Sequence, residues 1–234
     1  MIFGGSFVIF GVGSEVPGGI ADVLGRSPGG DGIPSVSDAR EEVEERPNDP
    51  EALRKLSTAL QAEGETEEAI QTLERLRTIA PRDETGLREL ATLYVTQAAT
   101  LRQRAQREQA RMQQLAPEEP FLPAETTDIG RALGERPISD AITSDANEAF
   151  TATLTKLQEN YTKAKEIYLA VAELEPEDPT LQLQLADAAV NSGDTAAAIA
   201  AYKKFLELAP DDPSAQLVRD EIKRLEESTA DASG

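Results

Sequence analysis

Residues 179–212 read PTLQLQLADAAVNSGDTAAAIAAYKKFLELAPDD, and residues 50–83 read PEALRKLSTALQAEGETEEAIQTLERLRTIAPRD. The two stretches agree in register at Leu56 and Leu185, Gly64 and Gly193, Ala69 and Ala198, Ile70 and Ile199, and Pro81 and Pro210. Self-similarity over a period of this length is typical of repeat proteins in which each unit is a pair of packed helices. The sequence therefore predicts an all-α fold.

Each shared position has a physical role in such a unit. Gly64 and Gly193 are expected to end the first helix, where a left-handed residue is needed. Polar residues directly after each glycine start the second helix, and the alanines Ala69 and Ala198 are small because the two helices cross there. Pro81 and Pro210 stop the second helix.

The pattern resembles the tetratricopeptide repeat, carried by Leu56-Ser57, Gly64, Ala69 and Pro81 and again by the matching residues of 179–212. The aromatic residue that this family has at its fourth position is replaced by Leu53 and Gln182. The resemblance implies a solenoid of helical hairpins that binds a protein or peptide in a groove lined by the first helices.

Between the two regular units, Ala98 stands where the repeat expects its glycine, and no glycine or proline occurs between Gly86 and Pro117; residues 145–175 likewise contain neither glycine nor proline. We expect one repeat with both helices prolonged into an antiparallel, coiled-coil-like hairpin arm over 99–160, inserted in the middle repeat. Apolar residues step by three and four along each helix. On the second helix this seam is predicted as Phe150, Leu154, Leu157, Tyr161, Ala164, Tyr168 and Val171. The alternative is two further degenerate repeats.

Segments are expected as follows: an apolar N-terminus at 1–13, a Gly/Pro-rich linker at 14–36, a repeat domain at 37–228 and a disordered tail at 229–234. Within the domain we expect a repeat at 50–83, the interrupted repeat at 84–178, a repeat at 179–212 and a capping helix at 214–228. Apolar residues of the arm tip at 116–144 either cap the hairpin or contact a partner.

Composition excludes several function classes. The 234 residues contain no His and no Cys, so histidine-based zinc sites, cysteine nucleophiles and Ser-His-Asp triads are ruled out. The formal net charge of -20 argues against nucleic-acid binding. The acidic runs lack the spacing of a calcium loop. We expect no enzymatic activity, no cofactor and no bound metal.

Residues 1–13 carry no charged side chain. They are too short to cross a bilayer alone, and the expectation is that Met1 is not the natural start and that 1–13 is the outer end of a transmembrane anchor. The stretch GGSFVIFGVGSEVPGG resembles the membrane exit of bacterial membrane-anchored tetratricopeptide-repeat proteins. The repeat domain is then expected outside the cytoplasm; the alternatives are an interfacial N-terminus, a signal remnant and a cytoplasmic protein.

The resemblance assigns the groove-facing positions of each first helix. These are Arg54, Thr58, Gln61, Arg88, Thr92, Val95, Leu183, Asp187, Val190 and Asn191. Arg54 and Arg88 share a repeat position and form either a basic spot for a peptide carboxylate or ordinary helix-face ion pairs. Two functions are expected: a membrane-tethered adaptor that grips a protein partner through the groove or the arm, or a structural protein that self-associates through the arm.

Overall fold

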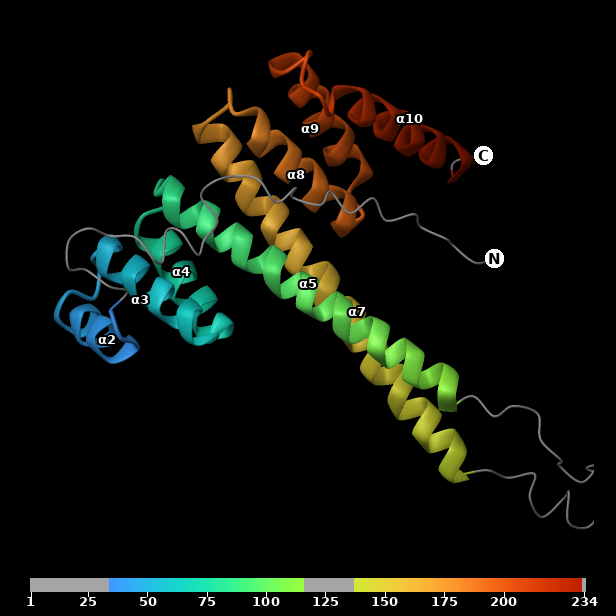
Figure 1. The fold of residues 1–234 in the computed structure, drawn as a ribbon, viewed down its shortest axis with the longest axis horizontal. Helices are drawn as coiled ribbons and strands as arrows, with labels where there is room; N and C mark the ends of the chain where they lie inside the picture. Colours follow the sequence, from blue (N-terminus) through green and yellow to red (C-terminus); the bar gives the residue numbers. More distant parts are fainter. Residues whose placement is uncertain (1–33, 116–136, 233–234) are drawn as a thin grey trace, which may run out of the picture.

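The computed structural model describes residues 34–115 and 137–232, and every regular element in them is an α-helix (Figure 1). The helices are α2 (Val36–Glu45), α3 (Pro50–Glu63), α4 (Thr66–Ile79), α5 (Glu84–Leu115), α7 (Pro137–Leu174), α8 (Pro179–Ser192), α9 (Thr195–Leu208) and α10 (Ala215–Ala232). The predicted all-α fold is confirmed.

The first helices α3 and α8 begin and end in the same way because their sequences carry the same signals. Asp49 and Asp178 cap the N-termini with their carboxylates, and a proline follows at the first helical position. Gly64 and Gly193 end the helices with φ angles of 81° and 83°. Both glycines therefore adopt the left-handed conformation that the sequence predicts.

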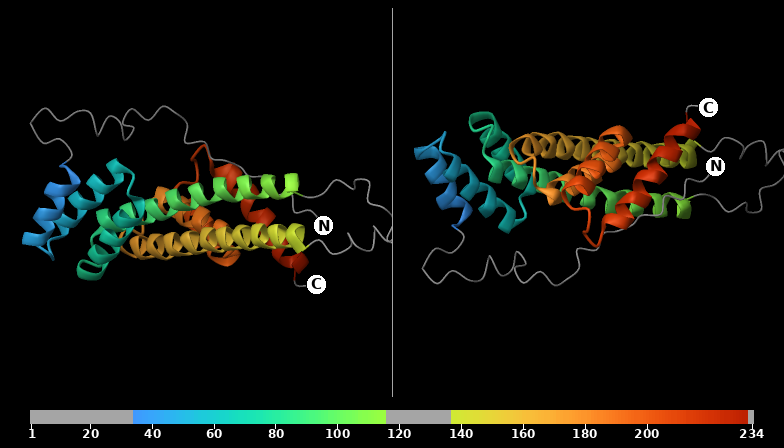
Figure 2. Two further views of the ribbon diagram at one scale, coloured as in Figure 1. Left: turned by 90° about the horizontal axis from the view of Figure 1, so that it is seen from below. Right: turned by 90° about the horizontal axis from the view of Figure 1, so that it is seen from above.

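Helices α5 and α7 are the longest, with 32 and 38 residues, and they lie side by side in opposite directions (Figures 1 and 2). Arg88 contacts Glu175 near one end of the pair, and Glu108 lies against Thr153 near the other. The far part of the pair, residues 99–115 and 144–160, is called the arm below. That the arm is an insertion within one repeat stays a prediction.

The predicted seam of α7 is partly wrong. The sequence places Leu154 on the seam, but this side chain is 41% exposed, whereas Thr153 is 3% and Asn160 is 8% exposed. The antiparallel packing turns the stripe of Thr153, Leu157 and Asn160 toward α5, and it leaves Leu154 on a flank of the arm. The apolar character of Leu154 favoured the wrong stripe, because sequence pattern alone does not fix the rotation of a helix about its axis.

Some predicted boundaries also differ from the structure. Helix α7 begins at Pro137, ahead of the expected start at Asp145. Helix α10 continues to Ala232, beyond the expected end of the capping helix at 228, and residues 233–234 of the expected tail lie outside the described residues. The predicted segment 1–13, most of the linker 14–36 and residues 116–136 of the arm tip lie outside the described residues.

One apolar core runs through successive helices, so that each helix is buried against its neighbours along the chain. Leu53, Leu73, Leu90, Ile167, Leu181 and Phe205 are the large side chains at its centre. Helix α4 packs on α5, α7 packs on α8, and α9 packs on α10. This nearest-neighbour packing is that of a helical solenoid.

The predicted membrane-anchored localisation is wrong for the part of the chain that the structure describes. Among residues 34–115 and 137–232, no helix has the length and apolar character needed to cross a membrane.

Candidate functional site

The predicted groove residues all lie on α3, α5 and α8, and together they define what is called the first-helix face. Arg54, Thr58 and Gln61 come from α3; Arg88, Thr92 and Val95 come from α5; Leu183, Asp187, Val190 and Asn191 come from α8. Polar contacts connect the three helices at this face. The Nε2 of Gln61 lies 3.4 Å from Glu89 of α5, and Arg102 of α5 lies 2.8 Å from Asn191.

The two arginines of the predicted basic spot are held by carboxylates. Arg54 donates to Oδ2 of Asp83, and Arg88 donates to Oδ2 of Asp178 over 2.7 Å and also to Glu175. Burial alone would raise the pKa of Asp178, but hydrogen bonds from Arg88 and from the backbone of α8 outweigh it and hold this pKa below its ordinary value. These ion pairs favour the structural interpretation over a carboxylate clamp for a ligand.

Each of these aspartates uses its two oxygens for different contacts. Oδ1 of Asp83 accepts from the backbone N–H of Gly86 over 2.8 Å, and Oδ1 of Asp178 accepts from Thr180 and Leu181. The other oxygen of each carboxylate takes the arginine of the preceding first helix. One side chain therefore caps a helix and ties that helix to the one before it.

Arg102 was not among the predicted face residues, yet it joins α5 to α8. Its guanidinium lies 2.6 Å from the Tyr161 hydroxyl, 2.8 Å from Oδ1 of Asn191 and 5.3 Å from the centre of the Tyr161 ring. Arg88 and Arg102 thus bridge α5 to the start and the end of α8. The repeat pattern describes a first helix of regular length. Arg102 lies on α5 beyond that length, so the pattern assigns it no groove position.

The uncharged residues of the face are half-buried or engaged with their own helix. Val95, Leu183 and Val190 are half-buried against the core. The hydroxyls of Thr58 and Thr92 donate to the carbonyl oxygens of the residues four positions earlier, over 3.0 and 2.8 Å. The face therefore offers aliphatic surface between polar groups that already have partners.

Asp187 is the acidic group of the face that burial affects most clearly. Burial raises its pKa, and the hydrogen bond from the Tyr202 hydroxyl, 3.0 Å from Oδ1, opposes that rise. Burial likewise raises the pKa of Glu89, beside Gln61. These two partly desolvated carboxyl groups, one on the face and one beside it, can accept hydrogen bonds from a partner. Within the part of the chain that the structure describes, no nucleophile, base and orienting group come together around them.

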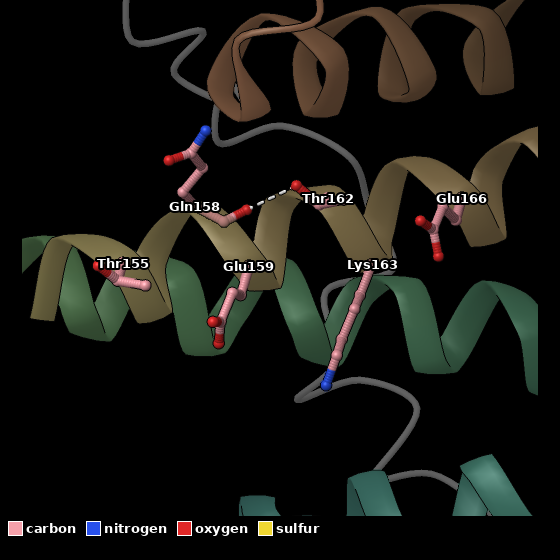
Figure 3. A pocket seen from close by; sticks show the side chains of 6 residues that line it. All are labelled: Thr155, Gln158, Glu159, Thr162, Lys163 and Glu166. Atoms are coloured by element: carbon pink, nitrogen blue, oxygen red, sulfur yellow. Dashed lines mark hydrogen bonds between the residues drawn. The ribbon is translucent and has the colours of Figure 1, made fainter. Parts of the chain in front are cut away.

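A shallow hollow lies on α7 instead. Figure 3 shows its lining, which consists of Thr155, Gln158, Glu159, Thr162, Lys163 and Glu166. All six side chains come from one helix, and the hydrogen bond drawn between them joins the Thr162 hydroxyl to the Gln158 carbonyl oxygen. Among the described residues no group of acidic side chains could hold a metal ion. The hollow is open to solvent, so it lacks the enclosure of a small-molecule site.

Comparison with known families gives two matches. A family model described as tetratricopeptide repeat matches residues 158–213, and a second model of the same description matches residues 51–82. The first covers the end of α7 with α8 and α9, and the second covers α3 and α4. No curated protein sequence matches this chain significantly.

Solved structures overlap the chain only loosely. The crystal structure of MamA protein has a TM-score of 0.28 at 17% identity, covering 77% of this chain and 83% of that one. TTC0263, a thermophilic repeat protein in Thermus thermophilus, has a TM-score of 0.26 at 22% identity, covering 81% and 88%.

Proposed function

The chain is a tetratricopeptide-repeat protein, and we propose that it is a non-enzymatic scaffold that binds a protein partner through its first-helix face. Repeat arrays of this kind present extended surfaces built from equivalent positions of successive units. The proposal places the partner against α5 and α8, which are joined by hydrogen bonds of Arg88 and Arg102.

The observation that carries the proposal is the way α5 and α8 are joined. Arg88 to Asp178 and Arg102 to Asn191 hold the two helices at the two ends of α8. Half-buried aliphatic side chains, Val95 on α5 and Leu183 on α8, belong to the same face. A partner segment that covers them gains apolar burial without breaking either polar bridge.

Asp187 adds a polar contact to this face. Among the described residues only Tyr202 donates to its carboxylate, through Oδ1. A lysine, an arginine or a backbone N–H of the partner would donate to the remaining oxygen, and the partly desolvated surroundings would strengthen that bond. The partner segment is therefore expected to combine apolar side chains with a donor or cation.

Site-specific crosslinking in the native host tests the proposal. A photo-reactive residue replaces Val190 on the first-helix face, and a matched one replaces Leu217 on α10, which is 41% exposed. We expect a defined protein adduct at Val190 and none at Leu217. Equal labelling at both positions, or no adduct at either, would contradict the proposal.

The captured protein is then purified for an affinity measurement. Leu183→Asp is expected to weaken its binding by about tenfold or more, because it places a charge in the apolar part of the contact. Leu169→Asp is the control, since Leu169 is 53% exposed on α7 and does not belong to the face. An unchanged affinity of Leu183→Asp would move the contact elsewhere.

A further inference from the structure

Three arginines line one flank of the arm. Arg104, Arg107 and Arg111 on α5 are spaced by three and four residues, which places them on one side of that helix, and they are called the arginine stripe. Arg102 points toward α8, and a residue two positions further lies about 200° around the helix. The arginine stripe therefore faces away from α8.

Contacts of α7 identify that flank. The ammonium of Lys163 lies 5.0 Å from the centre of the Tyr94 ring, and the Tyr94 hydroxyl bonds to Glu74 of α4. Figure 3 shows Lys163 and Gln158 pointing to opposite sides of α7, with Gln158 on the side of α8. Lys156, one heptad before Lys163, occupies the same flank as Lys163.

The cations of this flank are short of carboxylate partners. Arg104 pairs with Glu108 over 2.7 Å. The side chains of Arg107, Arg111 and Lys156 are exposed and make no hydrogen bond or ion pair with another described residue, although the charge of Arg107 helps to lower the pKa of Glu108. Glu159, on α7, likewise has no ion pair within the described ranges. The whole chain has 43 acidic and 23 basic residues, so carboxylates are abundant elsewhere in the sequence, yet few of them contact the cations of this flank.

A matching set of carboxylates lies on α2. Asp38, Glu41 and Glu45 are spaced by three and four residues, as the arginines are, and they are called the acid stripe. All three side chains are exposed, and no cation among the described residues contacts them. Each stripe extends over about 10 Å of helix, so the charges of the two stripes coincide when the helices lie parallel.

We propose that the arginine stripe binds the acid stripe of a second copy of this chain. Within one molecule the two stripes cannot meet, because α2 and the end of the arm lie at opposite ends of the long axis (Figures 1 and 2). The contact joins two different surfaces, and each copy carries both. A closed dimer forms only when a two-fold axis relates the two copies, so that the contact is made twice. This inference does not depend on the first-helix face or on its partner.

Electrostatic repulsion between two copies of this acidic chain limits which surfaces can come into contact. Two chains of formal charge -20 repel each other at long range, but at physiological ionic strength the screening length is about 8 Å. Opposite charges in contact are screened less, so only complementary patches favour association. Nucleic acid and anionic lipid also carry negative charge, but the acidic remainder of the chain repels an extended polyanion.

Complementary charge reversal tests the proposal on the full chain at physiological salt. Wild type is expected to associate in analytical ultracentrifugation. The triple variants R104E/R107E/R111E and D38K/E41K/E45K are each expected to dissociate about tenfold or more easily. Mixing the two variants is expected to restore association. K203E/R219E/K223E on α9 and α10 changes net charge as the first variant does, and it is expected to associate like wild type.

Circular dichroism of each variant confirms that its helices are retained. A monomeric wild type at all accessible concentrations overturns the proposal. Failure of the mixed variants to associate also overturns it, because restored complementarity is what the contact requires. If wild type stays monomeric but retains a duplex oligonucleotide or anionic vesicles through the arginine stripe, the stripe serves another partner class and the proposal is wrong.

Discussion

Arg88 lies 2.7 Å from Oδ2 of Asp178, the carboxylate whose other oxygen caps the first helix of the next unit. Arg54 and Asp83 make the same contact one unit earlier. In both units the arginine is the fifth residue of the repeat frame, and the aspartate directly precedes the first residue of the next unit. Adjacent first helices are therefore tied by one recurring arrangement.

Removing the shared carboxylate should cost more than removing its arginine. Asp178→Ala loses the cap and the ion pair, and we expect the free energy of unfolding to fall by about 1–2 kcal/mol. Arg88→Ala should lower it by about 1 kcal/mol or less, since this side chain is 31% exposed and solvent screens the pair. Urea denaturation measures both, with Arg82→Ala as an exposed control. Equal costs for the two variants would mean that the cap contributes nothing.

The left-handed glycines give a prediction that depends on backbone conformation alone. Gly64 has φ 81° and no atom within 4 Å of an added Cβ. Gly64→Ala is therefore expected to destabilise the fold by about 1–2 kcal/mol through its left-handed backbone. Gly64→Asn should cost less, because Asn tolerates this conformation better. Thermal unfolding compares the two, and equal costs would contradict the conformational explanation.

Gly86 should be intolerant for a different reason. A Cβ at this position of α5 would lie 2.4 Å from Cδ2 of Leu76 on α4. Gly86→Ala is expected to cost about 1–3 kcal/mol by overpacking, although alanine favours helix. Adding Leu76→Val should recover part of that loss in the same denaturation assay. If Leu76→Val adds its own full cost to that of Gly86→Ala, the steric explanation fails.

Asn160 weakens the interior of the arm. Its Nδ2 donates to the Lys156 carbonyl oxygen over 2.7 Å, but its buried Oδ1 has no hydrogen-bond partner among the described residues. Asn160→Leu is expected to stabilise the chain by about 1 kcal/mol, because an unsatisfied polar atom is removed from the seam. Hydrogen exchange should slow in the arm and stay unchanged in α3. Faster exchange in the arm of this variant would refute the argument.

The raised pKa of Asp187 makes stability depend on pH. Burial raises the folded pKa above the unfolded one, so the ionised group costs stability above the folded pKa, and that cost disappears as pH falls below the unfolded pKa. Asp187→Asn keeps an acceptor for Tyr202. Its stability relative to wild type should therefore be greater at pH 7 than at pH 4. A difference that does not change with pH would show that Asp187 titrates normally.

Sequence predicts local features of this fold better than contacts between units. Gly64 and Gly193 predict helix ends because a left-handed backbone conformation depends only on the residue and its immediate neighbours in the chain. The sequence wrongly placed Leu154 on the seam. The face of α7 that meets α5 depends on the rotation of the two helices about their axes, which the sequence pattern does not give. Contacts of the face such as Arg102 to Asn191 arise only after α5, α7 and α8 have assembled.

The third unit breaks the recurring arrangement. Leu183 occupies the place of Arg54 and Arg88. The carboxylate of Asp212, the counterpart of Asp83 and Asp178, bonds to Ser214 of its own turn and to no other residue that the structure describes. The last helix is therefore attached mainly by apolar contact and by the exposed pair of Lys203 and Glu226. Fraying of the array should begin at this C-terminal end, while the units before it melt as a single cooperative block.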